Sequence, residues 1–453
     1  MFRKFVIAFM VLAAAVAAGC SSSDVENASS NVPTPAEQRP SGDNNTAEQA
    51  KEENLDPVEL VFYSTSGDFA TEEHFMEVIG GPIQTQFPHV TPKFILYESG
   101  SQLETMVTIG ETIDILFNSS GMTPDTLLKY DMQFDISELI SKYDFDLNVL
   151  EPTTIEIQRM FSGGGIYGLP VFTTTNTMYY NRDLFDRFGV EYPADDMTWE
   201  EVYQMAETMS RTEDGVDYRG LIISPTHSFR LNALSVPYID PETNQTTFET
   251  DLFKRMLETY TKIYEANGIL FPAGQASYGP QLATFDKDQT TAAFIGLSTL
   301  GAVRFKDTIN WDVATHPVYA DQPDIGPQSY PTYFYITNMT EHKDIAFQVT
   351  AFMTSEGYQY HLAREGIMPV LKDTGFIEEF GMNVPYYNGK NINALLPKKY
   401  ADPMPISPYR SIAEPILRRK YEEVITAQKD INTALREAKE EADKAIAEAI
   451  AAE

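Results

Sequence analysis

The chain has 453 residues, 66 of them acidic and 33 basic, and its formal net charge is −33. The basic residues are not clustered, which disfavours nucleic acid and an anionic membrane surface as partners, because both require a basic footprint. The acidic residues are spread along the predicted helices, and we interpret them mainly as a solvated surface. The single cysteine, Cys20, excludes an internal disulfide.

The N-terminal residues are typical of an export signal. Arg3 and Lys4 precede an apolar run over 5–18, which has signal-peptide length and is too short to span a bilayer. We therefore predict a signal peptide over 1–19 and an extracytoplasmic protein.

The residues around Cys20 resemble the lipobox of bacterial lipoproteins. Small residues precede the cysteine, although Ala17 stands where Leu is usual. The resemblance implies lipidation of Cys20 and anchoring of the protein to the cell membrane by its lipid. Residues 20–56 are rich in Ser, Asn, Pro, Ala and Glu, which predicts a disordered linker.

The body of the chain, from residue 57 on, is too long for one hydrophobic core, so two domains of about 200 residues each are expected. Its first part alternates between the two periodicities, with strands predicted over 58–63, 91–97 and 113–117 and helices over 69–87 and 102–109. This alternation favours an α/β fold with parallel strands. Because ligands meet such sheets at the carboxyl ends of the strands, the hydroxyl-rich loops 64–68 and 118–121 are candidate binding loops.

A glycine pattern in the middle of the chain has the spacing of a dinucleotide-binding motif. Gly163, Gly165 and Gly168 satisfy G-x-G-x-x-G, but that motif must open a helix whose N-terminus binds pyrophosphate. Here Pro170 and a β-branched segment follow. The pattern therefore predicts a glycine turn before a strand.

Shorter patterns predict the remaining elements. Thr198 and Glu201 have the spacing of a capping box and begin a helix that extends to Ser210. Residues 224–230 are predicted as a polar and aromatic loop after a strand, and 366–370 as a turn with a short strand. Further predicted elements are strands over 290–296, 311–317 and 330–337 and helices over 251–267, 344–353, 357–364 and from Asp430 onward.

Taken in order, these segments resemble the family 1 extracellular solute-binding proteins, the receptors of bacterial ABC importers that include sugar-binding proteins. The resemblance is carried by Gly168-Leu169-Pro170, by Met178 to Phe185, by Thr198 to Glu201, by Ala292 to Phe294 and by Ala346 to Gly366. It implies a type II periplasmic-binding-protein-like fold with two doubly wound sheets joined by a hinge. Lobe 1 would comprise 57–171 plus 328–367, and lobe 2 would comprise 172–327 plus 368–453.

The resemblance also implies a ligand site between the lobes. Transferred position by position, the loops at the lobe edges offer the ligand-binding candidates Tyr63, Ser64, Ser66, Asp68, Asn118, Ser119, Thr173, Thr174, His227, Phe229, Arg230, Ser298 and Thr299. No Trp stands near Ser298, where sugar receptors often carry one, which argues against a long oligosaccharide. Tyr330 and Tyr333 are alternative sources of aromatic rings, although hinge or core positions suit them better.

Motifs for catalysis or metal binding are not evident in the sequence. The histidines lack metal-ligand spacing, and there is no nucleophile elbow. Asp144, Asp146 and Asn148 imitate a calcium loop, but Ile155 stands where its bidentate Glu belongs. Tyr179-Tyr180 resembles the paired tyrosines of ferric-ion receptors, yet neighbours in a strand face opposite sides of a sheet. We predict no cofactor, no metal and no enzymatic activity.

The leading hypothesis is therefore a receptor that captures a neutral polar solute, a carbohydrate above all, and delivers it to membrane permease subunits. A receptor for a cationic ligand such as a polyamine is the alternative suggested by the acidity of the chain. A secreted carbohydrate-active enzyme is a further alternative, but no pair of carboxylates stands out for it. A monomer is expected, because a jaw-like closure needs no permanent partner.

Overall fold

The computed structural model describes residues 56–65, 69, 71–98, 102–272 and 274–452. The predicted signal peptide, Cys20 and nearly all of the predicted linker lie outside the described residues, as do Ser66 and Asp68. Within the described part, no helix combines the length and apolar character needed to cross a membrane.

The first sheet has the strand order β2-β1-β3-β11-β4. Its strands β1, β2 and β3 are parallel, and β11 runs antiparallel to both of its neighbours. These strands are β1 (Val58–Tyr63), β2 (Val90–Ile95), β3 (Ile115–Ser119), β4 (Gly168–Phe172) and β11 (Thr332–Ile336).

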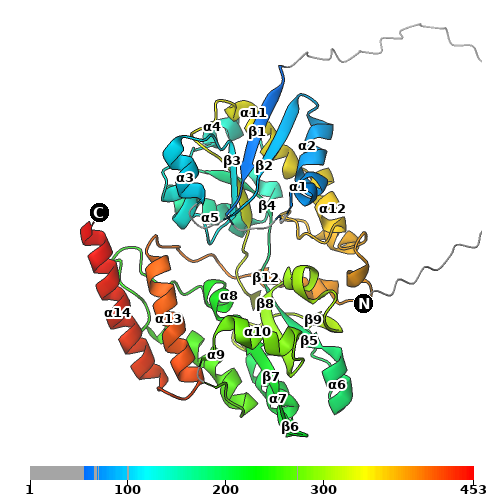
Figure 1. Ribbon diagram of the computed structural model, residues 1–453, viewed down its shortest axis with the longest axis vertical. Helices are drawn as coiled ribbons and strands as arrows, with labels where there is room; N and C mark the ends of the chain where they lie inside the picture. Colours follow the sequence, from blue (N-terminus) through cyan, green and yellow to red (C-terminus); the bar gives the residue numbers. More distant parts are fainter. Residues whose placement is uncertain (1–55, 66–68, 70, 99–101, 273, 453) are drawn as a thin grey trace, which may run out of the picture. The chain divides into compact units, whose positions relative to one another are not determined.

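Both faces of the first sheet are buried, as expected of a doubly wound sheet. In β11, Phe334 and Ile336 pack with one apolar cluster while Tyr333 and Tyr335 pack with another, because successive side chains of a strand point to opposite faces. The helices of this part are α1 (Glu72–Phe75), α2 (Gly81–Gln86), α3 (Gln102–Ile109), α4 (Ser137–Lys142), α5 (Pro152–Ser162), α11 (Lys343–Met353) and α12 (Glu356–Arg364) (Figure 1).

The second sheet has the strand order β6-β7-β8-β5-β9, with β7 and β8 parallel and β5 antiparallel to β8 and β9. Its strands are β5 (Asn176–Asn181), β6 (Arg211–Glu213), β7 (Val216–Ile223), β8 (Thr291–Leu297) and β9 (Trp311–Ala314). The accompanying helices are α6 (Arg182–Phe188), α7 (Trp199–Met209), α8 (Pro225–Arg230), α9 (Asp251–Asn267), α10 (Tyr278–Asp286), α13 (Arg410–Ile425) and α14 (Ile431–Ala452).

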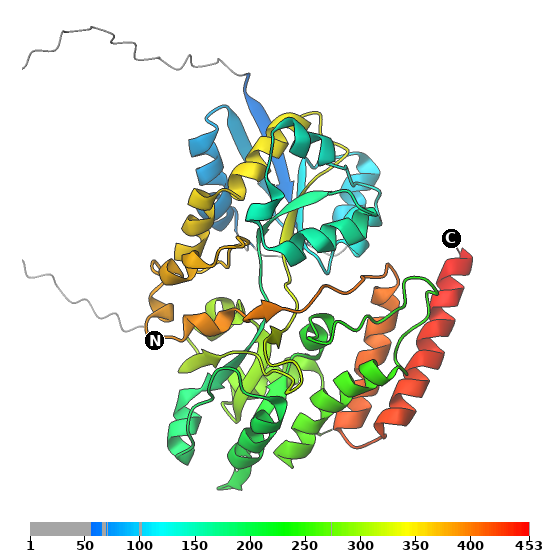
Figure 2. The same cartoon turned by 180° about the vertical axis from the view of Figure 1, so that it is seen from behind.

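The two sheets are joined by three segments of the chain, and these segments lie side by side (Figures 1 and 2). Residues 173–175 connect β4 directly to β5, and Thr174 exchanges two backbone hydrogen bonds with Tyr330, at 3.3 and 2.8 Å. The backbone N–H of Thr173 also donates to the carbonyl of Met368 at 2.9 Å. These contacts form the hinge of the type II fold. The predicted boundaries of the two lobes stay a prediction.

Most predicted elements are confirmed to within a few residues. Thr198 caps α7 in a complete capping box with Glu201, and the glycine pattern leads into β4 at Gly168 rather than into a helix. The predicted C-terminal helix is present as α14, which packs on α13 and α9.

Two predictions were wrong. The predicted loop 224–230 is mostly helix α8, because Pro225 occupies the first turn, where its missing N–H costs nothing. No strand forms within 366–370, because the N–H of Val370 donates to the side-chain oxygen of Gln359 at 2.8 Å instead of to a neighbouring strand.

Candidate functional site

The carboxyl ends of β1 and β3 adjoin because these strands are neighbours and parallel. Asn118 is fully buried there. Its side-chain oxygen accepts two hydrogen bonds from Thr65, one from the backbone N–H at 3.1 Å and one from the side-chain hydroxyl at 3.0 Å. Its amide nitrogen donates to Thr126 at 3.2 Å. The hydroxyl of Ser64 also donates to Asn118, at 3.4 Å. Asn118 therefore holds the start of the loop after β1 in place through these hydrogen bonds.

Tyr63 is also buried, and its hydroxyl donates to Gln102 at 3.3 Å. Burial, with a smaller contribution from Tyr97, raises the pKa of Tyr63 to about 12, so the phenol stays neutral. Tyr63 and Asn118 are thus buried residues that support the loop after β1. Ser119, by contrast, is partly exposed to solvent.

Tyr330 connects the edge of the first sheet to α8. Its hydroxyl accepts a hydrogen bond from Ser119 at 3.2 Å and one from Nη1 of Arg230 at 3.4 Å. Its ring centroid lies 6.4 Å from that of His227, and His227 lies 6.2 Å from Tyr278. Three rings and an Arg are therefore gathered where the two sheets meet.

The positive charge of Arg230 is matched by a carboxylate. Nε and Nη2 of Arg230 donate to the two carboxylate oxygens of Glu414 at 2.8 and 3.0 Å. Burial lowers the pKa of Arg230, but Tyr330 and Glu414 outweigh that effect and raise it above its ordinary value. The pair is a charge-neutral, bidentate unit.

His227 is uncharged in this setting. Its Nδ1 lies 2.7 Å from the hydroxyl of Ser224, which directly follows β7. Burial, together with the nearby charge of Arg230, lowers the pKa of His227 to about 4. At neutral pH it therefore presents a neutral imidazole.

The hinge adds further hydroxyl groups. The hydroxyls of Thr174 and Ser298 lie 2.9 Å apart, and the Ser298 hydroxyl accepts from the N–H of Thr175 at 3.4 Å. Thr173 is buried and bonds to the carbonyl of Thr174, whereas Thr299 is exposed. These hydroxyls are largely engaged with one another.

The structure thus brings most described candidates to the edges at which the two sheets meet. Phe229 differs, since its ring has 0% exposure and packs against Tyr260 and Tyr421, so it presents no face to a ligand. Both tryptophans are also buried, each with 2% exposure, and are not available for stacking. Sequence reasoning missed Glu414 and Arg410, whose only sequence signal is a charged pair four residues apart on α13.

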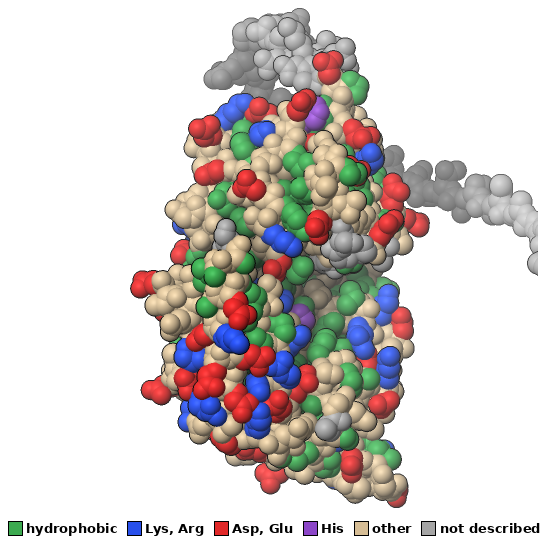
Figure 3. Space-filling model, turned by 60° about the vertical axis from the view of Figure 1, so that its left-hand side comes forward, with side chains coloured by type: hydrophobic (Ala, Val, Ile, Leu, Met, Phe, Trp, Pro, Cys, Tyr) green, Lys and Arg blue, Asp and Glu red, His purple; other side chains and the backbone are tan. Residues whose placement is uncertain are grey.

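Figure 3 shows a hollow near the middle of one face of the molecule. Hydrophobic, basic and histidine side chains border this hollow. A small pocket of about 20 Å³ lies beside Arg230, Tyr330 and Arg410, with room for about one water. A larger pocket, of about 860 Å³, lies between residues 143–149, 351–360 and 371–373, and no predicted site residue lines it.

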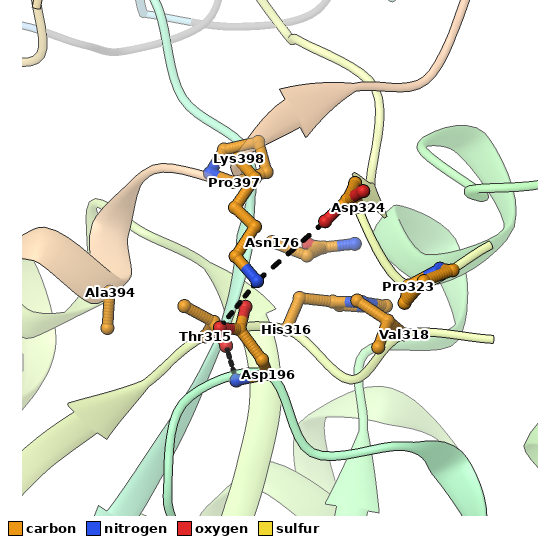
Figure 4. Close-up of a pocket in the computed structure, with 11 residues that line it drawn as sticks. Asn176, Asp196, Thr315, His316, Val318, Pro323, Asp324, Ala394, Pro397 and Lys398 are labelled. Atoms are coloured by element: carbon orange, nitrogen blue, oxygen red, sulfur yellow. Dashed lines mark hydrogen bonds and ion pairs between the residues drawn. The ribbon is translucent and has the colours of Figure 1, made fainter. Parts of the chain in front are cut away.

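Another small pocket, of about 10 Å³, lies beside the hinge next to the first residue of β5 (Figure 4). Asn176 lies there among Lys398, Asp324 and His316, and its amide has no hydrogen-bond partner among the described residues. Lys398 forms ion pairs with Asp196 at 2.8 Å and Asp324 at 3.8 Å. The pocket is far too small for a sugar.

His316, in this pocket, predicts an acid-sensitive stability. Its Nδ1 lies 2.8 Å from the carbonyl of Pro317 and so carries the proton, and burial outweighs this bond and lowers its pKa to about 4. In the unfolded chain the imidazole binds its second proton near pH 6.5, whereas in the folded protein it does so only near pH 4. The free energy of unfolding should therefore fall as the pH is lowered from about 6.5 to 4, by up to about 3 kcal/mol from this group. Melting curves across this range, for the protein and for His316→Leu, measure the effect. If the melting midpoints of the protein and of His316→Leu change with pH in parallel, this prediction is contradicted.

Within the described ranges, no group of three or more His, Cys, Asp or Glu side chains is arranged to hold a metal ion. What the arrangement can do chemically is hydrogen-bond a polar molecule through hydroxyls, a neutral imidazole and one guanidinium, with tyrosine rings nearby.

The model of the bacterial extracellular solute-binding protein family matches residues 82–360. An ABC substrate-binding protein from Listeria monocytogenes, solved in complex with cycloalternan, has a TM-score of 0.68 at 17% identity over 86% of this chain and 100% of its own. A sugar transporter from Rhizobium etli, in an open conformation, has a TM-score of 0.68 at 19% identity over 85% of this chain and 99% of its own. A solute-binding protein from Thermotoga lettingae, bound to α-D-tagatose, reaches 0.62 at 16% identity over 86% and 100%. These likenesses establish the fold.

Proposed function

Since this chain belongs to the bacterial extracellular solute-binding proteins, we propose that it is the receptor of an ABC importer for a neutral polar solute of the carbohydrate class. The family implies an extracytoplasmic location. The observation that carries the proposal is the composition of the edges where the two sheets meet, which offer hydroxyls and tyrosine rings, and whose described charged candidate, Arg230, is neutralised by Glu414.

The charge balance favours a neutral ligand over a charged one. Arg230 is matched by Glu414, and His227 is neutral because its pKa lies at about 4. Uncompensated charge in a partly buried site would disfavour a ligand that brings no counter-charge. A polyamine would need exposed carboxylates, and at the described centre of the proposed site the carboxylate is that of Glu414, which is buried and bound to Arg230.

The ligand-contacting set that we propose is drawn from the sequence candidates and their neighbours. Ser119, Arg230, His227 and Tyr330 form its centre, with the hydroxyls of the loop after β1 and of Thr174 and Ser298 around it. Ser66 and Asp68 stay in the proposed set through the resemblance alone. The ligand would lie between the lobes and favour their closure.

We further propose that Cys20 is lipidated, that the lipid anchors the receptor to the cell membrane as a monomer, and that the closed receptor delivers its ligand to the permease. Support for the anchor comes from the small residues before Cys20 and the apolar run that precedes them.

Thermal unfolding of the mature chain carrying Cys20→Ser tests the ligand class. The panel comprises maltotetraose, cycloalternan, D-tagatose, spermidine and ferric ion. A ligand at 100 times its Kd adds about 2.7 kcal/mol to the stability of the native state and raises the melting midpoint by a few degrees. We expect a carbohydrate to raise the midpoint without being turned over, and Arg230→Met to abolish that rise.

A response to spermidine or iron alone would replace the carbohydrate by a charged ligand. Chemical change of a bound sugar would indicate an enzyme instead. An unchanged response of Arg230→Met would move the site away from the proposed centre.

A further inference from the structure

We infer that helix α13 carries two positioning residues for the ligand site, Glu414 and Arg410, and that Glu414 keeps the site selective for uncharged ligands. The inference rests on the proposed function, because it assigns these residues to the proposed ligand site. Neither residue was among the sequence candidates.

Glu414 orients Arg230. Both of its carboxylate oxygens accept from the guanidinium, from Nε and from Nη2, and this leaves Nη1 to reach the Tyr330 hydroxyl. The carboxylate side chain is only 5% exposed, whereas that of Arg230 is 20% exposed. The guanidinium is therefore held from its buried side and presents its remaining edge toward the ligand.

Arg410 ties the same helix to the first sheet. Its Nη2 donates to the carbonyl oxygen of Gly121, in the turn after β3, and lies 3.7 Å from the carboxylate of Asp125. Its Nε lies 3.7 Å from Glu414, one helical turn along. Arg410 thus fixes the position of Glu414 relative to the strand that ends in Ser119.

The turn at Gly121 is fitted to this arrangement. A Cβ atom at this residue would lie 2.2 Å from the hydroxyl of Tyr330, closer than real contacts allow. The close approach brings Tyr330 within reach of Ser119 and Arg230 together. Gly121, Tyr330, Arg230, Glu414 and Arg410 therefore form one continuous polar network, which we name the α13 bridge.

Charge makes the role of Glu414 more than structural. The α13 bridge and Asp125 together contain two guanidinium groups and two carboxylates, and the more buried carboxylate is that of Glu414. Removing its charge leaves an excess positive charge beside the ligand site. Arginines without a carboxylate partner bind anions through their planar fork, so the variant should gain affinity for an anion.

The test compares Glu414→Gln with the matched control Glu441→Gln, which removes an exposed carboxylate of α14 that is paired with Arg419 of α13. Inorganic phosphate is the probe, titrated against sodium chloride of equal ionic strength. We expect phosphate to raise the melting midpoint of Glu414→Gln by a few degrees and to leave the wild-type protein and the control unchanged. Any carbohydrate found with the panel above should bind Glu414→Gln about tenfold more weakly, as expected when a charge-assisted hydrogen bond is lost.

A second readout needs no ligand. In a 15N spectrum, the Nε–H of Arg230, assigned by its loss in Arg230→Lys, should exchange slowly in the wild-type protein and rapidly in Glu414→Gln. The double variant Arg410→Gln with Glu414→Gln keeps the charges balanced and serves if the single variant does not fold. It should show the same rapid exchange.

Slow exchange of the Arg230 Nε–H in a folded Glu414 variant would overturn the inference, as would a folded Glu414→Gln that gains no phosphate response. Failure of every carbohydrate together with the expected phosphate and exchange results would instead contradict the proposed ligand class and leave the positioning role intact.

Discussion

Replacing Asn118 by leucine is expected to lower the free energy of unfolding by about 2–4 kcal/mol and to weaken ligand binding more than tenfold. Leucine has nearly the same size, but it cannot accept the hydrogen bonds that reach the Asn118 oxygen from Thr65. Thr126 also loses its donor. Each buried polar group left without a partner costs about 1–3 kcal/mol.

The expected loss of binding follows from where these bonds act. Asn118 joins the end of β3 to the loop after β1 through its hydrogen bonds with Thr65. Because Thr65 is only partly buried, water satisfies part of the hydrogen bonding that the substitution removes. The loop would then sample other conformations at the edge of the proposed site.

Urea unfolding and ligand titration measure both effects. Asn148→Leu is the control, because Asn148 is exposed and bonds only locally to Asp146 among the described residues. It should change stability by about 0.5 kcal/mol or less. A loss below about 1 kcal/mol for Asn118→Leu would contradict the role assigned to this side chain.

The sheets could be predicted because their residues repeat at short range. In Val58–Tyr63 the alternation of apolar side chains fixes a strand without any knowledge of its partners. The capping box at Thr198 works in the same way, because both of its partners lie within four residues. Loops placed at the ends of such strands then identified Ser64 and Ser119 as candidates.

The α13 bridge could not be predicted because its partners lie far apart in the chain. Arg230 and Glu414 are separated by 184 residues, and Arg410 and Gly121 by 289. No local pattern in a single sequence encodes such a pair. Even the helix that carries Glu414 is difficult to predict, because a proline such as Pro415 inside α13 normally indicates a break in a helix.

Burial is the other quantity that the sequence concealed. Phe229 stands beside Arg230 and was an equally good candidate by position, yet in a short helix neighbouring side chains point in different directions. The ring enters the core of the second sheet while the guanidinium lies at its edge. A site inferred from loop position alone therefore includes supporting residues such as Tyr63 together with residues that can touch a ligand.

Gly220→Ala is expected to destabilise the second sheet by about 3 kcal/mol or more, because β7 lies directly against helix α7. A Cβ at Gly220 would lie 2.2 Å from the carbonyl oxygen and 2.3 Å from the Cα of Ala206. Both are backbone atoms, so no side chain can move aside, and the strand and helix would have to separate.

The matched control for this substitution is Gly357→Ala in α12, where, among the described residues outside its own turn of helix, no atom lies within 4 Å of the added methyl group. There alanine should raise stability by up to about 1 kcal/mol, because glycine is the weaker helix former. Since β7 leads into Ser224 and α8, separating β7 from α7 should also displace His227 and Arg230 and weaken ligand binding. Calorimetric melting of the two variants therefore gives shifts of opposite sign, and equal melting midpoints would show that α7 and β7 pack less closely than the backbone distances require.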